Sequence, residues 1–165
     1  MLKLFLHAQD IDIALLQEIS MNHLNGISRY NVYMNRGTDG RVTAILTKEG
    51  MTATNIMRLP TGRGMAAEIN GTWIINIYAP SGAEKRAERE CYFNNEVPVL
   101  MPPVGRDIIL AGDFNSIIDK RDSTSQNNIS RALTTLISGC ELCEVWGTVQ
   151  NRNGYTFYPL GYLAI

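Results

Sequence analysis

The stretch at residues 108–115, Ile-Ile-Leu-Ala-Gly-Asp-Phe-Asn, constrains the fold of this chain more than any other. Its run of β-branched and apolar residues predicts a buried strand. The strand ends at Gly112, after which Asp113 and Asn115 stand two residues apart. Because side chains alternate along an extended segment, both polar groups are expected to point the same way from the end of the strand. A carboxylate and a carboxamide would then lie together at the rim of a sheet.

Two earlier segments have the same form, an apolar run that ends in polar side chains. The first, residues 11–18, ends in Glu18, and the second, residues 73–80, carries Tyr78 near its end. In α/β folds, sites gather where strands end and face a cleft. The ends of the three predicted strands are therefore the candidate functional positions.

Strand-like and helix-like segments alternate along the chain. Two pairs of strands are predicted to form hairpins, the second of them around the turn-forming pair Asn70-Gly71. The hairpin strands are residues 30–34 with 41–47 and residues 65–69 with 73–78, and helices are expected at residues 2–9, 84–95 and 129–140. Hairpins mixed with helix-linked buried strands indicate the α/β class, with two packed mixed β-sheets and helices outside.

The two later helices are each expected to bury one apolar side. In the helix at residues 84–95 the buried side would carry Ala87 and Cys91, with Asn94 as a further candidate. Pro98, Pro102 and Pro103 would end the helix. In the helix at residues 129–140 it would carry three aliphatic side chains, Leu133, Leu136 and Ile137.

Composition indicates one domain with a substantial core, since the 165 residues are 45% apolar and 19% charged. The net charge of −1 shows no electrostatic footprint for nucleic acid over the whole chain, although an enzyme can use a local basic patch. No segment approaches the roughly 20 apolar residues of a membrane helix, so no membrane partner is expected.

The three cysteines favour a reducing compartment, because they form no even disulfide framework. Cys140 and Cys143 have Cys-x-x-Cys spacing, but no second such pair and no histidine pair accompanies them. We interpret the cysteines as small buried side chains rather than as a zinc or redox site.

Each candidate side chain also has a purely structural interpretation. Glu18 is either a hard oxygen ligand for Mg²⁺ or a solvated glutamate at a strand end. Tyr78 is either an active-site group or a half-buried aromatic on a sheet face, and Asn76 either holds a neighbouring group or satisfies the backbone. Neither histidine, His7 or His23, lies near such a strand end, so no catalytic histidine is expected.

The three strand ends occur in an order that resembles the endonuclease/exonuclease/phosphatase family. The matching segments are Leu-Leu-Gln-Glu ending at Glu18, Ile-Tyr-Ala-Pro around Tyr78 and Leu-Ala-Gly-Asp-Phe-Asn ending at Asn115. Glu-Val-Trp at residues 144–146 and the aromatic residues 155–159 look like one branch, the apurinic-type endonuclease domain of LINE-type (non-LTR) retrotransposons. The resemblance implies a four-layer, DNase I-like α/β sandwich.

The resemblance also implies a role for each of four side chains. Glu18 matches the family's metal-binding glutamate, and Tyr78 matches the active-site tyrosine near the scissile phosphate. Asp113 matches the aspartate that activates or orients the attacking water, and Asn115 matches the asparagine that steadies the phosphate. The family hydrolyses phosphodiesters with Mg²⁺, for which Mn²⁺ is the alternative, and leaves a 3′-hydroxyl. The implied partner is DNA.

The chain departs from the family pattern at both ends. The family opens with an asparagine-bearing strand and closes with strands carrying Ser-Arg-Ile-Asp and Ser-Asp-His, and these have no counterpart here. Ser81 follows Tyr-Ala-Pro where many members have asparagine. We therefore expect residues 1–165 to be one domain of this family, a fragment without the first strand and the C-terminal catalytic strands.

The expected function is Mg²⁺-dependent nicking of DNA by a monomeric, intracellular domain of retrotransposon origin that acts in the nucleus. One alternative is a truncated remnant without activity, which the absent closing signature favours. The other is a phosphatase of the same fold that acts on a small lipid or inositol phosphate. The Tyr-Ala-Pro strand and the Gly-Asp-Phe-Asn segment favour the nuclease over this phosphatase.

Overall fold

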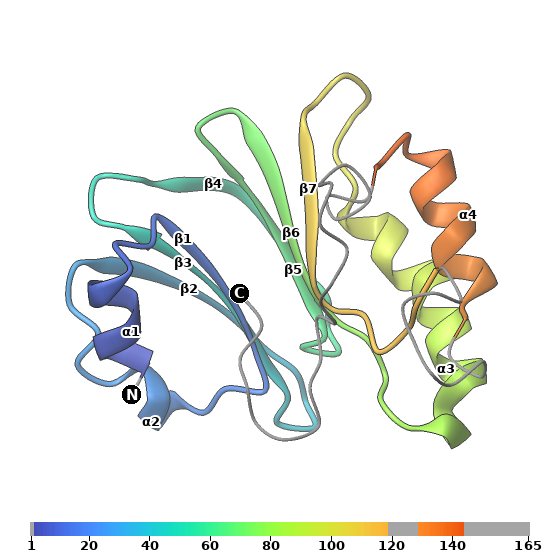
Figure 1. The fold of residues 1–165 in the computed structure, drawn as a ribbon, viewed down its shortest axis with the longest axis horizontal. Helices are drawn as coiled ribbons and strands as arrows, with labels where there is room; N and C mark the ends of the chain where they lie inside the picture. Colours follow the sequence, from blue (N-terminus) through green and yellow to red (C-terminus); the bar gives the residue numbers. More distant parts are fainter. Residues whose placement is uncertain (1, 119–128, 144–165) are drawn as a thin grey trace.

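The computed structural model describes residues 2–118 and 129–143, which form two β-sheets packed face to face with helices on both outer faces (Figure 1). This is the four-layer α/β arrangement predicted from the sequence. The segments at residues 144–146 and 155–159 lie outside the described residues. Within those residues, no helix has the length and apolar character needed to cross a membrane.

Within the described residues, the first sheet has three strands in the order β1-β3-β2, and each neighbouring pair is antiparallel. Its strands are β1 (Ile13–Gln17), β2 (Tyr30–Arg36) and β3 (Val42–Lys48), and β2 and β3 form the predicted hairpin. Side chains of β3 alternate between its two faces. Ala44 and Leu46 pack with Leu6 of α1 (Leu2–Ala8), whereas Ile45 faces the second sheet. The short helix α2 (Met21–Leu24) lies on the same outer side as α1 (Figure 1).

The second sheet is mixed and has four strands in the order β4-β5-β6-β7. These are β4 (Ala53–Arg58), β5 (Gly64–Ile69), β6 (Thr72–Tyr78) and β7 (Ile108–Asp113), and only the pair β6 and β7 is parallel. The β5–β6 hairpin turns at Asn70-Gly71, as predicted. β4 was not predicted, because this exposed edge strand has a register shift between Thr54 and Met57 and no regular apolar alternation.

The outer face of the second sheet is covered by α3 (Arg86–Cys91) and α4 (Arg131–Gly139) (Figure 1). A 3-10 turn at Ala83–Lys85 precedes α3, and the helical backbone continues through a π turn at Tyr92–Glu96 and a 3-10 turn at Val97–Leu100. Pro98 therefore does not end the helical segment, which ends at Leu100, before Pro102 and Pro103. It occupies the first turn of the last 3-10 segment, where a proline is tolerated because no N–H is required.

The buried side of α3 differs from the one predicted. Ala87 and Cys91 are exposed, whereas Arg89, Tyr92 and Phe93 are buried. The change from α to π geometry moves the buried side away from the positions that regular helical spacing selects. In α4 the prediction is confirmed, since Leu133 is buried and the other two aliphatic side chains pack against the same core.

The cysteines are not small buried side chains, contrary to the interpretation made from the sequence. Cys91 and Cys143 are exposed and Cys140 is half-buried, and all three are free thiols. Cys91 is exposed because it lies on the solvent side of α3, and the other two lie at the C-terminal end of α4 or just after it.

β7 is an edge strand and is only partly buried, which corrects the prediction of a buried strand. Ile109 is 51% exposed, although Ile108 and Leu110 pack against the helix-side core. Among the described residues, β7 has a strand partner only on the β6 side. The face that Ile109 shares with Asp113 is therefore open, and this leaves the end of β7 accessible.

Candidate active site

Glu18 and Tyr78 meet where the two sheets come together. Tyr78 is the last residue of β6 and is 6% exposed, and Glu18 is an exposed residue directly after β1. The Tyr78 hydroxyl donates a hydrogen bond to the Glu18 carboxylate. Glu18 has a left-handed backbone conformation, with φ 52°. This turn, unusual for a residue other than glycine, places its side chain at the end of β6.

Asp113 stands beside Tyr78 on the neighbouring strand, since the two residues are partners in the parallel register of β6 and β7. The pairing continues one residue further, where the Ala79 amide donates to the Asp113 carbonyl oxygen at 2.8 Å. Asp113 is therefore placed by backbone hydrogen bonds rather than by a flexible loop. It presents its carboxylate on the side of the sheet that Tyr78 also faces.

Asn115 joins the same group, but not by the extended geometry that was predicted. β7 ends at Asp113, and Asn115 has φ 46°, so the chain turns instead of continuing as a strand. Its backbone N–H donates to Asp113 Oδ1 at 3.0 Å, the pattern of an Asx turn. Its Nδ2 donates to the Ala79 carbonyl oxygen at 3.0 Å. The turn ties Asn115 to the ends of both β6 and β7.

Asn76 supports this arrangement from inside. It is fully buried between the sheets, where its Nδ2 donates to the carbonyl oxygens of Leu16 at 3.0 Å and Ala44 at 2.8 Å. Its Oδ1 accepts a hydrogen bond from Gln17 Nε2 at 2.6 Å. Of the two interpretations offered from the sequence, the structure shows that Asn76 satisfies the backbone, and it also fixes the residue that precedes Glu18.

The pKa values of Asp113 and Tyr78 are shifted because both side chains are partly buried and lie near the Glu18 carboxylate. Partial burial of the carboxyl group raises the pKa of Asp113, the Asn115 N–H bond lowers it, and the charge on Glu18 raises it. Burial also raises the pKa of Tyr78, and its hydrogen bond to Glu18 adds to this effect because a phenolate could not donate it. The Asp113 carboxyl group thus lies close enough to Glu18 for the charge on Glu18 to affect its pKa.

Arg63 is a residue of this site that sequence reasoning did not select. Its side chain is buried, and Nη1 donates to the Tyr78 carbonyl oxygen at 3.3 Å. The guanidinium carbon lies 5.3 Å from the centre of the Tyr78 ring, within range of a cation–π contact, and Nη2 is 3.6 Å from Glu88. Arg63 lies between two glycines in a loop, a context that gives no local signal for burial.

The candidate metal ligands are few. Within residues 2–118 and 129–143, no three histidine, cysteine, aspartate or glutamate side chains gather closely enough to hold a metal by themselves. Glu18 and Asp113 offer two carboxylates. His7 packs edge-on against Tyr30, and His23 accepts a hydrogen bond from the Ser20 amide.

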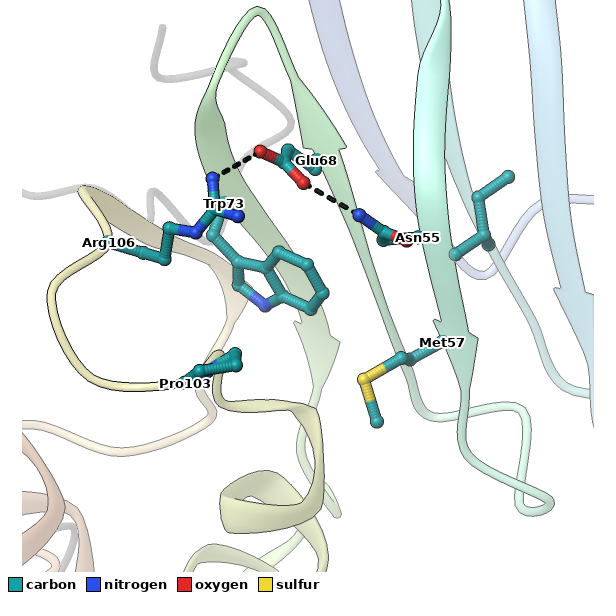
Figure 2. A pocket seen from close by; sticks show the side chains of 7 residues that line it. Asn55, Met57, Glu68, Trp73, Pro103 and Arg106 are labelled. Carbon is teal, nitrogen blue, oxygen red and sulfur yellow. Dashed lines mark hydrogen bonds and ion pairs between the residues drawn. The ribbon is translucent and has the colours of Figure 1, made fainter.

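A pocket at the other end of the second sheet is separate from this site (Figure 2). It lies beside Trp73, near the start of β6, five residues before Tyr78, which at about 3.3 Å per residue is roughly 16 Å away. Its polar side chains satisfy one another, since Glu68 accepts hydrogen bonds from Arg106 at 2.6 Å and Asn55 at 2.7 Å (Figure 2). This pocket therefore offers no catalytic arrangement.

No protein-family model and no curated protein matches the chain. Solved structures do. An AP endonuclease from Archaeoglobus fulgidus matches with a TM-score of 0.65 and 18% identity, over 86% of this chain and 63% of its own. The fold is that of the DNase I-like nucleases.

Two further DNase I-like structures agree with this assignment. A 3′-5′ exonuclease (NExo) from Neisseria meningitidis matches with a TM-score of 0.64 and 17% identity, over 85% of this chain and 64% of its own. A D. rerio TDP2 humanized by 14 mutations matches with a TM-score of 0.62 and 16% identity, over 88% of this chain and 62% of its own. The chain thus spans less than two thirds of the length of these DNase I-like structures.

Proposed function

We propose that this chain hydrolyses phosphodiesters with Mg²⁺ and nicks DNA, at the site formed by Glu18, Tyr78, Asp113 and Asn115. The observation that carries the proposal is the convergence of these side chains from both sheets, through the Tyr78–Glu18 and Asn115–Ala79 hydrogen bonds. The DNase I-like structures add support, since they include an AP endonuclease and a TDP2 complexed with a single-strand DNA product.

Each side chain has a chemical task in this proposal. Asp113 orients a water molecule and accepts its proton while the water oxygen attacks phosphorus. The bond from phosphorus to the 3′ oxygen breaks, and that oxygen takes a proton from solvent to give a 3′-hydroxyl beside a 5′-phosphate. Asn115 donates a hydrogen bond to the phosphate oxygens as negative charge develops, through the Nδ2 hydrogen that the Ala79 carbonyl oxygen does not take. Tyr78 gives its single hydroxyl proton to Glu18 and so positions that carboxylate near the scissile phosphate. The Asn115 turn and the β6–β7 pairing hold these groups fixed.

The donor set fits a hard divalent cation. Mg²⁺ in proteins commonly binds through one or two carboxylates while water and substrate phosphate complete its coordination. Glu18 would hold it, with Asp113 close by, and both carboxylates are exposed on the open side of the site. The bound cation would neutralise phosphate charge. Mn²⁺ has the same ligand preference and is the alternative metal.

The wider setting is part of the same proposal. We infer a monomeric domain of retrotransposon origin that acts on DNA in the nucleus, from the LINE-type segments of the sequence. A catalytically dead remnant is the second candidate, and one observation favours it: among residues 2–118 and 129–143, no three histidine, cysteine, aspartate or glutamate side chains gather closely enough to hold a metal by themselves.

The product ends and the metal requirement test the proposal. Supercoiled plasmid treated with the purified chain in Mg²⁺ is offered to a DNA polymerase with labelled nucleotides. We expect label at the nicks without prior phosphatase treatment, and no nicks in EDTA. An inositol phosphate is the rival substrate in a parallel reaction. If the chain releases phosphate from the inositol phosphate and leaves the plasmid intact, the phosphatase is favoured. If a folded chain acts on neither substrate, the catalytically dead remnant is favoured.

A further inference from the structure

Arg89 is a buried charged side chain that the proposed chemistry does not use. It lies on α3 and is only 3% exposed, whereas Arg86 on the same helix is exposed. Among the described residues, no carboxylate lies within ion-pair distance of the Arg89 guanidinium. Since removing an ion from water without a counter-ion is costly, the hydrogen bonds of this group have to compensate.

Those hydrogen bonds join the two loops that carry the candidate site. Arg89 Nη1 donates to the carbonyl oxygens of Pro80 at 2.8 Å and Gly82 at 3.0 Å, both in the loop after β6. Arg89 Nε donates to Ser116 Oγ at 3.0 Å, in the loop after β7. Pro80 comes two residues after Tyr78, and Ser116 directly follows Asn115. One planar guanidinium therefore spans the loops that follow both strands.

Asn115 is the residue that most needs this support. Its left-handed backbone conformation is uncommon for a residue other than glycine and persists only where the surroundings hold it. The hydrogen bonds to Asp113 and Ala79 hold Asn115 itself. The Arg89–Ser116 bond holds the chain immediately after it, so loss of Arg89 would free one side of the turn.

We propose that Arg89 is a positioning residue, which locks the Pro80–Gly82 loop to Ser116 and so holds Asn115 against the end of β6 for phosphodiester cleavage. The catalytic part of this statement rests on the proposed function. This positioning role requires the rigid fork of N–H donors on the guanidinium. A lysine ammonium is a point charge and cannot donate to both loops with the same geometry.

The test compares Arg89→Met and Arg89→Lys with Arg86→Met, a matched change at an exposed position of the same helix. A misplacement of about 1 Å at a reacting centre can lower a rate roughly 100-fold. We expect Arg89→Met to lower kcat for plasmid nicking by about 10- to 100-fold with KM changed less than about twofold. The kcat of Arg89→Lys should lie between the values for Arg89→Met and wild type, and the kcat of Arg86→Met should match that of wild type.

A second readout requires no substrate. Amide hydrogen exchange of Ala79 and Asn115, whose N–H groups bond to Asp113, is measured by NMR with Ile75 in the core of β6 as reference. Arg89→Met should accelerate exchange at Ala79 and Asn115 at least about tenfold and leave Ile75 unchanged. A wild-type chain that does not nick would refute the proposed function, yet this exchange pattern would still establish the positioning role.

Two results would overturn the positioning role. One is wild-type exchange at Ala79 and Asn115 in Arg89→Met. The other is equal acceleration at all three amides, which would make Arg89 a general stabiliser of the fold. If Arg89→Met fails to fold, Arg89→Lys decides the question, and wild-type exchange in that variant would refute the proposal.

Discussion

The Tyr78 hydroxyl donates a hydrogen bond to the Glu18 carboxylate, which ties the end of β6 in the four-stranded sheet to the first residue after β1 in the three-stranded sheet. The candidate site is consequently built across the interface between the sheets. Its proposed metal ligand comes from one sheet, and Asp113, the carboxylate proposed to activate water, comes from the other. Activity should therefore depend on how firmly the two sheets are held together.

Glu18→Gln should separate metal binding from folding. Glutamine keeps an oxygen that accepts the Tyr78 hydrogen bond, but it removes the charge that would hold Mg²⁺. We expect a nicking rate at least about 100-fold lower and a higher Mg²⁺ concentration at half-maximal rate, with an unchanged melting temperature. Glu49→Gln, an exposed change in the turn after β3, is the control. Equal rates for the two variants would exclude Glu18 from the site.

Asn76→Ala should weaken the contact between the sheets. The change leaves the carbonyl oxygens of Leu16 and Ala44 and the Gln17 amide without their buried partner. At about 1–3 kcal/mol for each buried unsatisfied group, partly relieved by relaxation, we expect a loss of about 3 kcal/mol in the free energy of unfolding. Urea denaturation measures this free energy of unfolding. The control is Asn94→Ala at an exposed position, where we expect a loss under about 0.5 kcal/mol.

Gly112→Ala should cost far more than Gly71→Ala, although both glycines have positive φ. At Gly112, φ is 135° and an added Cβ would clash with the Ile77 carbonyl oxygen, whereas at Gly71 nothing lies within 4 Å. We expect a loss of about 3 kcal/mol or more for the first, from strain plus overpacking, and about 1–2 kcal/mol for the second, from backbone strain alone. Similar losses would mean that β6 and β7 are not packed this closely.

Tyr92 should make the fold sensitive to alkali. Its hydroxyl donates to the Arg63 carbonyl oxygen at 2.8 Å, and burial raises the pKa of the phenol well above its ordinary value. Below a pH of about 10, Tyr92 keeps its proton in both the folded and the unfolded chain, so the buried phenol contributes its full stabilisation. Above it the unfolded chain releases the proton and the folded chain does not, so stability falls by up to about 1.4 kcal/mol per pH unit.

Tyr92→Phe isolates that contribution. At neutral pH it should lower the free energy of unfolding by about 0.5–1.5 kcal/mol, since the Arg63 carbonyl oxygen loses one of its two donors and keeps the Tyr78 amide. The difference between wild type and variant should shrink as the pH rises above about 10. A difference that stays constant to pH 11 in urea denaturation would show that Tyr92 does not titrate in this way.

Much of the fold was predictable because its local signals agree with its tertiary structure. The Asn70-Gly71 hairpin and the buried side of α4 both follow from patterns within a few residues. β4 could not be predicted, since its pairing depends on β5 and its own sequence is irregular. The partial exposure of β7 likewise depends on which strands lie beside it, which apolar content does not specify.

The proximity of the candidate residues was more predictable than their geometry. Glu18, Tyr78, Asp113 and Asn115 were selected at strand ends and lie together, but the turn at Asn115 replaces the extended geometry expected there. Arg63 and Arg89 were not selected, because an arginine normally indicates a solvated surface. Their burial arises from carbonyl oxygens contributed by distant segments, which no local pattern shows.

The most direct test of the account is the nicking rate of supercoiled plasmid by the wild-type chain in Mg²⁺, beside Asp113→Asn. Asparagine keeps the oxygen that accepts the Asn115 amide but cannot take a proton from water. We predict nicking that EDTA abolishes and that Asp113→Asn lowers at least about 1,000-fold. A folded wild-type chain that leaves the plasmid intact, or an Asp113→Asn variant that nicks at the wild-type rate, would contradict the account.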